Sequence, residues 1–300
     1  MGVMTAAIIV TYHPEPGHVS ALIQLILPQV NRVLIIDNGT GVGLQDELRD
    51  LPILFLPNPK NIGLAAALNQ GLSIAADFGE DAVVLFDQDS EPSGDMVERL
   101  QDAYASLSNT RKVAAVGPLL VDARNGKKQP FVRIGFPLNT KIVPDDDAAV
   151  ACDYLITSGC YIPMTVLADV GMMDDALFID NIDMDWSFRA KAKGYELFGV
   201  PTATMMHRIG DVLFDMPMGM GQVMVHSPKR LYYSSRNRVL LYRRKHVSWT
   251  WILQDVPRFA LKFMRLVTFV KPRRKIARAM ILGLFDGIAG RTGEPSYRFD

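Results

Sequence analysis

Cysteine is scarce in this sequence, because Cys152 and Cys160 are its only two in 300 residues. Neither belongs to a C-x-x-C pair, which disfavours a zinc site of cysteines and a disulfide framework and fits a reducing cytoplasm. The Gly-x-Gly-x-x-Gly dinucleotide fingerprint and the Walker lysine motif are also missing from the sequence. Their absence disfavours Rossmann dinucleotide enzymes and P-loop NTPases.

Long apolar runs are missing as well. The sequence has no stretch of about 20 uncharged apolar residues, the length that a membrane-spanning helix needs. Its start, Met1 to Ile9, has no basic region and runs directly into a strand-like segment, so we expect no signal peptide. A chain of this length can bury a substantial core, as one large domain or one domain with an appendage.

Charge is balanced overall but divided unevenly along the chain. Residues 1–226 carry 15 Lys and Arg against 28 Asp and Glu, a balance of −13. Residues 227–300 carry 17 against 4, a balance of +13. Such a division indicates a basic appendage with an anionic partner, either nucleic acid or an acidic membrane surface. We therefore expect two parts, 1–226 and a helical, basic extension over 227–300.

Strand-like and helix-like runs alternate through the first half of the chain, which predicts an α/β fold with a mostly parallel sheet flanked by helices. The expected strands are Ala6–Thr11, Arg32–Ile36, Ile53–Leu56, Ala82–Phe86, Val113–Val116, Ala151–Thr157 and Tyr195–Val200. The first expected helices are His18–Leu27 and Asn61–Ala76. Residues 122–150 are polar and predict a loop or short hairpin, and residues 211–221 predict a Met- and Gly-rich loop.

The strand-like run Ala82–Phe86 ends in Asp87-Gln88-Asp89. Residues two apart in an extended chain point the same way, so both carboxylates could face one ligand. A divalent cation would relieve their repulsion, and oxygen ligands suit Mg²⁺ or Mn²⁺. Ligands of open α/β sheets bind beyond the carboxyl ends of the strands, where this motif lies. Alone, the motif could equally be an acidic turn.

Other polar groups also follow expected strands, and a parallel sheet would gather them on one edge. They are Thr11-Tyr12-His13-Pro14, Asp37-Asn38-Gly39, and Asn61-Ile62-Gly63 with Asn69-Gln70-Gly71. Asp37 could accept the N–H of a pyrimidine base. Asn61 and Gly63 precede a helix and could leave free N–H groups for a phosphate. Each group alone could also be an ordinary turn or cap.

A second acidic block extends from Asp180 to Arg189. If a helix begins near Asp183, its carboxylates lie in the first turn, where the helix dipole favours negative charge. Apolar neighbours could raise the pKa of one carboxylate to a value useful for a general base, although an acidic helix start needs no such role. His207 follows the last expected strand and could complete a metal shell or be structural.

In order along the chain, these segments make it resemble the family 2 glycosyltransferases with the GT-A fold, and among them bacterial rhamnosyltransferases. The resemblance covers roughly residues 5–245. Its motifs are Val10-Thr11-Tyr12, Asp37-Asn38-Gly39, the run from Asn61 to Gly71, Asp87-Gln88-Asp89, Thr157-Ser158-Gly159, Phe178 to Arg189, His207 to Asp211 and Tyr232 to Asn237.

The resemblance implies a role for each matching residue. Thr11 and Asp37 would contact the base and ribose, and Asn61, Gly63 and Asn69 would shape the nucleotide-sugar pocket. Asp87 and Gln88 would lie beside the donor, while Asp89 and His207 would bind Mg²⁺ or Mn²⁺. Asp183 would be the general base, with Asp185 and Trp186 beside the acceptor. Because Ile182 stands where the family often has Glu, Asp180 remains an alternative base.

The implied activity is metal-dependent, inverting transfer of a sugar from a nucleotide donor. The donor would be dTDP-L-rhamnose, and the acceptor a glycan or polyprenol-linked glycan in cell-surface polysaccharide synthesis. Three alternatives stay open: a UDP-hexose donor, a nucleotidyltransferase, and a non-catalytic scaffold on membranes. The nucleotidyltransferase is disfavoured because Thr11–Gly17 offers no Gly-rich phosphate loop bearing Arg or Lys.

The basic tail predicts an amphipathic helix over Trp251–Val270, followed by the polybasic run from Lys271 to Lys275. That combination favours attachment to an anionic membrane surface, on the inner face of the cell membrane if the protein is cytoplasmic. The alternatives are a helix packed on the catalytic part and a contact in a homo-oligomer. Nucleic-acid binding is disfavoured, since no recognised module is present.

Overall fold

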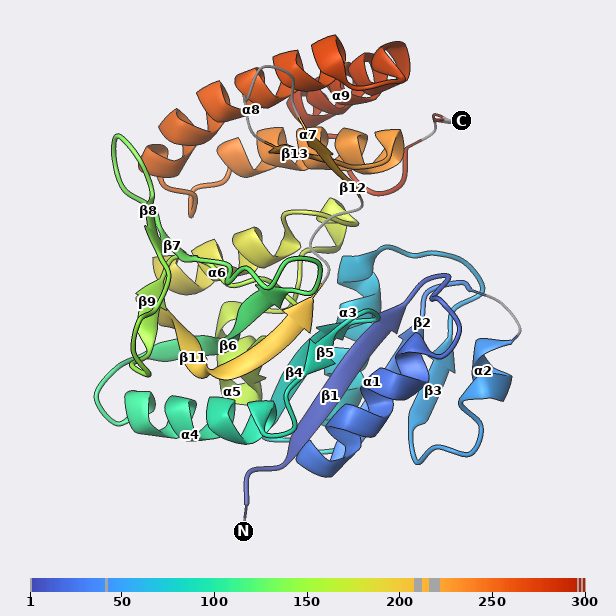
Figure 1. Ribbon diagram of the computed structural model, residues 1–300, viewed down its shortest axis with the longest axis vertical. Helices are drawn as coiled ribbons and strands as arrows, with labels where there is room; N and C mark the ends of the chain where they lie inside the picture. Colours follow the sequence, from blue (N-terminus) through green and yellow to red (C-terminus); the bar gives the residue numbers. More distant parts are fainter. Residues whose placement is uncertain are drawn as a thin grey trace.

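A twisted mixed sheet forms the centre of the computed structural model, which describes residues 2–40, 43–207, 212–215, 222–295, 297 and 299 (Figure 1). Its nine strands are β1 (Thr5–Thr11), β2 (Arg32–Asp37), β3 (Leu54–Pro57), β4 (Ala82–Asp87), β5 (Glu91–Pro92), β6 (Val113–Asp122), β9 (Val150–Cys152), β10 (Tyr161–Pro163) and β11 (Glu196–His207). The strand order is β3-β2-β1-β4-β10-β6-β11-β5, with β9 paired to β11.

Most of the longer strands pair in parallel. Strands β1, β2, β3 and β4 run the same way, as do β6 and β11. The short strand β10 is antiparallel to both β4 and β6 and joins these two sets. The predicted α/β fold with a mostly parallel sheet is therefore confirmed.

Helices cover both faces of the sheet, and alternate strand residues point to opposite faces. Ile8, Leu34 and Leu85 pack with α3 (Leu64–Asp77), α5 (Met164–Val170) and α6 (Ile182–Ala192). Their neighbours on the other face pack with α1 (His18–Ile26) and α4 (Met96–Ser108). The short helix α2 (Leu44–Glu47) and two 3₁₀ turns, η1 (Leu27–Gln29) and η2 (Asp175–Leu177), complete this part.

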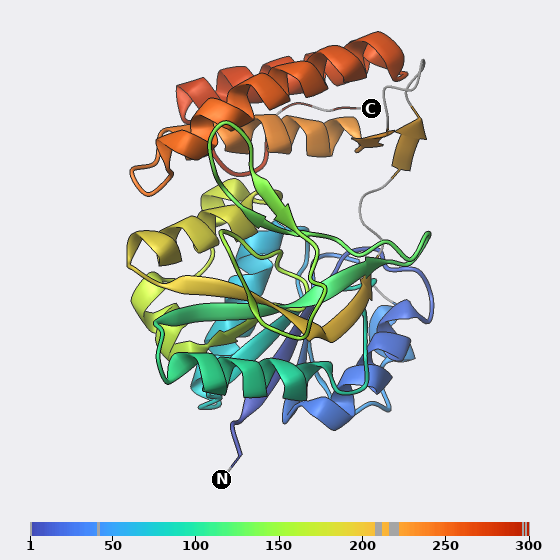
Figure 2. The ribbon, with the colours of Figure 1, turned by 60° about the vertical axis from the view of Figure 1, so that its left-hand side comes forward.

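The C-terminal part forms a separate layer of three helices, α7 (Pro228–Tyr242), α8 (Trp249–Phe269) and α9 (Arg273–Ala289). Figures 1 and 2 show α8 and α9 at the end of the molecule opposite the N-terminus, with α7 between them and the sheet. Gly283 lets α9 approach α7 closely, because an added Cβ would lie 2.4 Å from the carbonyl oxygen of Tyr232. The helical C-terminal extension is thus present as predicted, while its status as a separate domain stays a prediction.

Two hairpins complete the structure. Strands β7 (Phe131–Arg133) and β8 (Thr140–Ile142) form the short hairpin expected within residues 122–150. Strand β12 (Val212–Asp215) lies within residues 211–221, which were predicted to be a loop, and pairs with β13 (Gln222–Val225), which follows them. Residues 211 and 216–221 lie outside the described residues. Among the helices of the described ranges, none has both the length and the apolar character to cross a bilayer.

One predicted strand is wrong for most of its length. We expected Ala151–Thr157 to be extended throughout, but β9 ends at Cys152 and a loop follows. The loop turns at Gly159, where the N–H donates to the carbonyl oxygen of Leu85 at 2.7 Å. Apolar residues in this loop fill space beside the sheet without joining it, since Leu155 packs against Gly117. Burial, not pairing, explains their apolar character.

Candidate functional site

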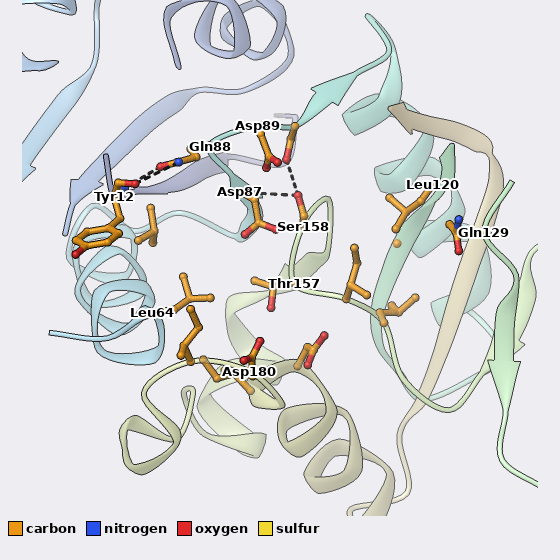
Figure 3. Close-up of a pocket in the computed structure, with 18 of the residues that line it drawn as sticks. Tyr12, Leu64, Asp87, Gln88, Asp89, Leu120, Gln129, Thr157, Ser158 and Asp180 are labelled. Carbon is orange, nitrogen blue, oxygen red and sulfur yellow. Dashed lines mark hydrogen bonds between the residues drawn. The ribbon is translucent and has the colours of Figure 1, made fainter. Parts of the chain in front are cut away.

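A cleft of about 1270 Å³ opens at the carboxyl ends of β1 and β4. Figure 3 shows Asp87, Gln88 and Asp89 on one side and Asp180 on the opposite side, with Thr157 between them. These residues come from three separate parts of the chain. The parallel arrangement of β1 and β4 brings the first wall together, as expected for ligand sites at the carboxyl edge of such a sheet.

The Asp-Gln-Asp turn is held in place by neighbouring side chains. The amide of Asp87 donates to the hydroxyl oxygen of Ser158 at 3.2 Å. Gln88 pairs with the backbone of Tyr12, accepting from its N–H at 2.7 Å and donating to its carbonyl at 3.3 Å. Asp87 and Asp89 both line the cleft, as their spacing predicts.

This donor set suits a hard divalent cation. Carboxylate oxygens are the ligands that Mg²⁺ and Mn²⁺ favour, and such ions commonly take the rest of their ligands from water and substrate phosphates. Asp87 and Asp89 lie side by side at the cleft, as that mode of binding requires. Within the described ranges, three or more His, Cys, Asp or Glu side chains do not gather in a metal-binding group. The side chain of His207, the predicted further ligand, lies outside the described residues.

Thr11 and Asp37 lie beneath the cleft and not in its lining. Both side chains are buried, and the Thr11 hydroxyl donates to Asp37 Oδ1 at 3.0 Å. The predicted direct contact of this pair with a base does not agree with that burial. The neighbouring Asn38 lines the cleft instead, donating to Asn61 Oδ1 at 3.1 Å and accepting from the Ile62 N–H at 2.9 Å. Asn61 itself lines the cleft, as predicted.

The N–H groups of Gly63 and Leu64, at the start of α3, have partners within the protein. Gly63 donates to Asn61 Oδ1 at 2.9 Å, and Leu64 donates to the carbonyl oxygen of Phe178 at 2.6 Å. Our prediction that these groups stay free for a phosphate is therefore wrong. Gly63 has φ +93°, and an added Cβ would lie 2.7 Å from the Phe178 ring. This close approach to Phe178 explains why glycine occupies position 63.

Asn69 ties α3 to the segment before α6 and does not line the cleft. Its side-chain amide donates to the carbonyl oxygen of Met173 at 2.9 Å and to Asp175 Oδ1 at 2.6 Å. Its own oxygen accepts from the Met173 N–H at 2.9 Å. The predicted pocket-shaping role is thus replaced by an indirect one, since Asn69 anchors the chain that leads into the opposite wall.

That opposite wall is a loop in an unusual backbone conformation. Phe178, Asp180 and Asn181 have φ values of 64°, 65° and 62°, in the left-handed region that residues other than glycine seldom adopt. Such conformations persist where the surrounding structure holds them, and they concentrate at functional sites. The loop leads directly into α6, so it sets the position of the carboxylates at the start of that helix.

Helix α7 holds the loop from the other side. The side-chain amide of Asn237 donates to the carbonyl oxygens of Leu177, Ile179 and Asp180 at 2.8, 2.7 and 2.9 Å. Arg236 is fully buried and donates to the carbonyl oxygen of Leu177 at 3.0 Å. These donors satisfy carbonyl groups that the loop's conformation leaves without regular partners.

Asp183 lies in the first turn of α6 and lines the cleft. Burial raises the pKa of its carboxyl group to about 6, assisted by the negative charges of Asp180 and Asp87 and opposed by the hydrogen bond from the Met184 N–H. That bond measures 2.8 Å to Oδ1. A carboxylate with a pKa in this range can take up a proton near neutral pH. Asp180, the alternative base, accepts a hydrogen bond from Arg230 at 2.9 Å.

Asp185 and Trp186 are buried and do not line the cleft. The prediction that they lie beside the acceptor does not agree with this burial. Asp185 binds Arg189 at 2.9 Å through Oδ2, and Arg244 and His246 at 2.6 and 2.8 Å through Oδ1. Burial raises the pKa of Asp185, but His246, Arg244 and Arg189 together outweigh it and leave the pKa below its usual value. This network joins α6 to the chain after α7.

Several cleft residues had no assigned role in our sequence interpretation. Asn38, Tyr154, His226 and Arg230 all line the cleft. Asn38 could have been found, because it follows Asp37 in a turn at a strand end and carries an amide. His226 and Arg230 could not, since they precede and begin α7 and no local pattern indicates that this helix closes the site.

A family model matches a segment within the amino-terminal half of the chain. Residues 7–133 match the model described as Glycosyl transferase family 2. This segment runs from within β1 to the end of β7 and therefore contains the Asp-Gln-Asp wall of the cleft. A curated relative, the dTDP-rhamnosyl transferase RfbF of Shigella flexneri, is 32% identical over 294 residues, which cover 97% of each chain.

Solved structures show the same fold at low sequence identity. The structure of GalNAc-T7 with UDP, GalNAc and Mn²⁺ superposes with a TM-score of 0.60 at 14% identity over 96% of this chain. The match spans 57% of that longer chain. Residues 1–349 of S. aureus TarS, in complex with UDP-GlcNAc, give a TM-score of 0.58 at 15% identity. The match covers 95% of this chain and 81% of the TarS chain.

Proposed function

The chain belongs to the glycosyl transferase family 2, and from this we propose that it transfers L-rhamnose from dTDP-L-rhamnose, with inversion, to a glycan or lipid-linked glycan acceptor. The observation that carries the donor assignment is the identity of 32% to a dTDP-rhamnosyl transferase over nearly the whole of both chains. We further propose that the acceptor belongs to cell-surface polysaccharide synthesis and that the protein works in the cytoplasm or on the inner face of its membrane.

The donor would lie against the wall formed by the end of β4. Asp89 would hold Mg²⁺ or Mn²⁺, with Asp87 beside it and His207 as a further ligand. When bound, this cation supplies positive charge to the diphosphate leaving group. Gln88 would position the donor through its pairing with Tyr12, and Asn61 would contact it from the adjoining loop. Thr11, Asp37 and Asn69 would act indirectly, by fixing the turns that carry the contacting groups.

Asp183 would be the general base. A new bond forms between the acceptor oxygen and the anomeric carbon, the bond from that carbon to the diphosphate oxygen breaks, and the acceptor proton passes to Asp183. Its pKa of about 6 suits this role, because the carboxylate is ionised near neutral pH yet basic enough to hold the proton. The ion pair of Asp180 with Arg230 makes Asp180 a weaker candidate.

Donor turnover can be tested without knowing the acceptor. We would measure hydrolysis of dTDP-L-rhamnose, UDP-glucose and UDP-N-acetylglucosamine with Mn²⁺ or Mg²⁺, and again with a chelator. The native chain would be compared with Asp89→Asn and with Asp95→Asn, a control on the exposed start of α4. We expect turnover of dTDP-L-rhamnose that depends on metal, falls at least about a hundredfold in Asp89→Asn and is unchanged in Asp95→Asn.

Other outcomes would change the proposal in distinct ways. Preference for a UDP-sugar would keep the family and overturn the rhamnose assignment. Full turnover in the presence of chelator would overturn the proposal that the reaction depends on a metal ion. Absence of donor binding in folded protein would favour a non-catalytic scaffold.

A further inference from the structure

Helices α8 and α9 expose a row of large apolar side chains on the side facing away from α7. We propose that this face docks on the surface of an anionic lipid bilayer. We call it the outer face and define it by Trp249, Leu253, Val256, Ala260 and Met264 of α8 and by Arg274, Arg278, Ile281, Phe285 and Ile288 of α9. The proposal stands independently of the sugar donor.

The spacing of these residues places each set on one side of its helix. Positions 249, 253, 256, 260 and 264 recur every three or four residues, as do 274, 278, 281, 285 and 288. The exposed fractions of Trp249, Leu253, Phe285 and Ile288 are 75%, 60%, 65% and 65%. These side chains therefore contribute little to the core.

The opposite sides of the same helices already fill the core of the C-terminal layer. In α8, Trp251 and Leu266 are buried, and in α9, Ile276 and Met280 are buried. Packing of the layer thus accounts for the inner apolar residues and leaves the outer ones unexplained. A group of exposed apolar side chains of this kind marks an interaction surface.

Positive charge lies at the end of the outer face where α8 turns into α9. Lys271, Arg273, Arg274, Lys275 and Arg278 are all exposed, and no ion pair joins any of them to another described residue. Basic clusters beside an apolar ridge are attracted by anionic headgroups, while the apolar side chains enter the boundary with the acyl chains.

The acidic side chains of α8 and α9 point inward. Asp255 binds Arg238 at 2.7 Å, and Asp286 accepts from the Tyr232 hydroxyl at 2.7 Å. Both are buried. The outer face therefore carries no carboxylate from either helix. Two copies joined through it would bring their basic residues together without acidic partners, so an anionic bilayer is the occupant that its charge favours over a second copy.

The position of the layer gives docking a direct consequence for the cleft. In Figures 1 and 2, α8 and α9 lie on the far side of α7 from the sheet. His226, which precedes α7, and Arg230, in its first turn, line the cleft. A bilayer on the outer face would thus lie beyond the wall of the cleft that α7 provides. If the acceptor is lipid-linked, as we propose, docking would hold the cleft near the bilayer that carries the acceptor, with the helical layer between them.

Binding to vesicles tests the proposal. The purified full chain would be sedimented with phosphatidylcholine vesicles containing or lacking phosphatidylglycerol, at low and high salt. One variant combines Leu253→Asp with Phe285→Asp, and a second combines Arg273→Glu with Arg274→Glu. Matched controls are Leu138→Asp, exposed at the tip of the β7–β8 hairpin, and Lys127→Glu with Lys128→Glu.

We expect the native chain to bind vesicles only when they contain phosphatidylglycerol, and more weakly at high salt. Each outer-face variant should bind at least about tenfold more weakly, and the controls should bind as the native chain does. Absence of native binding, or equal binding by the outer-face variants, would overturn the proposal. Loss of a dimer in Leu253→Asp with Phe285→Asp, without vesicle binding by the native chain, would assign the face to a second copy. Hydrolysis of donor measured in the same preparations distinguishes these failures from failure of the proposed activity.

Discussion

The side-chain amide of Asn237 donates a hydrogen bond of 2.9 Å to the carbonyl oxygen of Asp180, a residue 57 positions earlier in the chain. The same amide also reaches the carbonyl oxygens of Leu177 and Ile179. Helix α7 therefore supports the loop that leads to Asp183. The C-terminal extension, which the sequence indicates as an appendage, is built into the wall of the cleft.

Asn237→Asp tests this support with a change of almost no volume. It replaces a buried donor with an acceptor that faces three carbonyl oxygens, which should cost roughly 2–4 kcal/mol of unfolding free energy. We expect kcat for sugar transfer to fall about tenfold or more, because the loop no longer holds Asp183 in place, while the Kd for donor changes little. Ser234→Ala on the same helix is the control. Native kcat in the folded Asn237→Asp protein would contradict the role of α7.

Asp180→Asn separates the two candidate bases by pH dependence. The charge of Asp180 contributes to the raised pKa of Asp183, so its removal should lower that pKa from about 6. Because the base must be ionised, the rate falls at acid pH, and this fall should move to lower pH in the variant. Asparagine tolerates the φ of 65° at this position. Loss of activity at every pH, in folded protein that binds donor, would instead identify Asp180 as the base.

Gly63→Ala should destabilise the protein through backbone strain and through a clash with Phe178. Gly79→Ala measures the backbone strain alone. Gly63 and Gly79 have φ values of +93° and +71°, so alanine is strained at both. An added Cβ meets the Phe178 ring at Gly63 but open space at Gly79. We expect Gly79→Ala to cost about 1 kcal/mol and Gly63→Ala at least about 1–3 kcal/mol more, measured by urea unfolding. Equal losses would show that Phe178 moves aside freely.

Asp185→Asn should lower the free energy of unfolding but have a smaller effect on the rate of catalysis. It leaves the cations around a buried carboxylate without their partner, which typically costs about 3–5 kcal/mol. The lowered pKa of Asp185 means that its stabilisation is present above the unfolded value of about 3.9 and is lost as pH falls through the folded value. The difference in unfolding free energy between native chain and variant should therefore shrink below about pH 4. Asp169→Asn, in an exposed pair with Lys193, should cost under about 1 kcal/mol at any pH.

The parts of the fold that local sequence patterns determine were predictable. The strands ending at Thr11, Asp37 and Asp87 are apolar runs bounded by turn residues, and each is buried in the sheet as expected. The antiparallel strand β10 was missed, since its residues Tyr161–Pro163 are too few to show a pattern. The run after Cys152 was misassigned, because apolar residues that pack beside a sheet resemble those that pair within it.

The sequence predicted those site residues that follow the ends of strands. It could not predict residues whose position depends on contacts with distant parts of the chain. Asp87, Asp89 and Asp183 line the cleft, and motif positions alone indicated them. The sequence could not show that Thr11 bonds Asp37, that Asn69 bonds the Met173 backbone, or that Asp185 points away from the cleft. Each of these depends on partners between 26 and 104 residues away.

One single-turnover comparison tests most directly whether Asp183 takes the acceptor proton in a rhamnosyl transfer. Native chain and Asp183→Asn would each be mixed with dTDP-L-rhamnose, metal and a lipid-linked glycan acceptor, while titration calorimetry gives the Kd for donor. We expect Asp183→Asn to bind donor within about threefold of native and to transfer sugar about 10²- to 10⁴-fold more slowly. Transfer by Asp183→Asn at the native rate would contradict the assignment of the base.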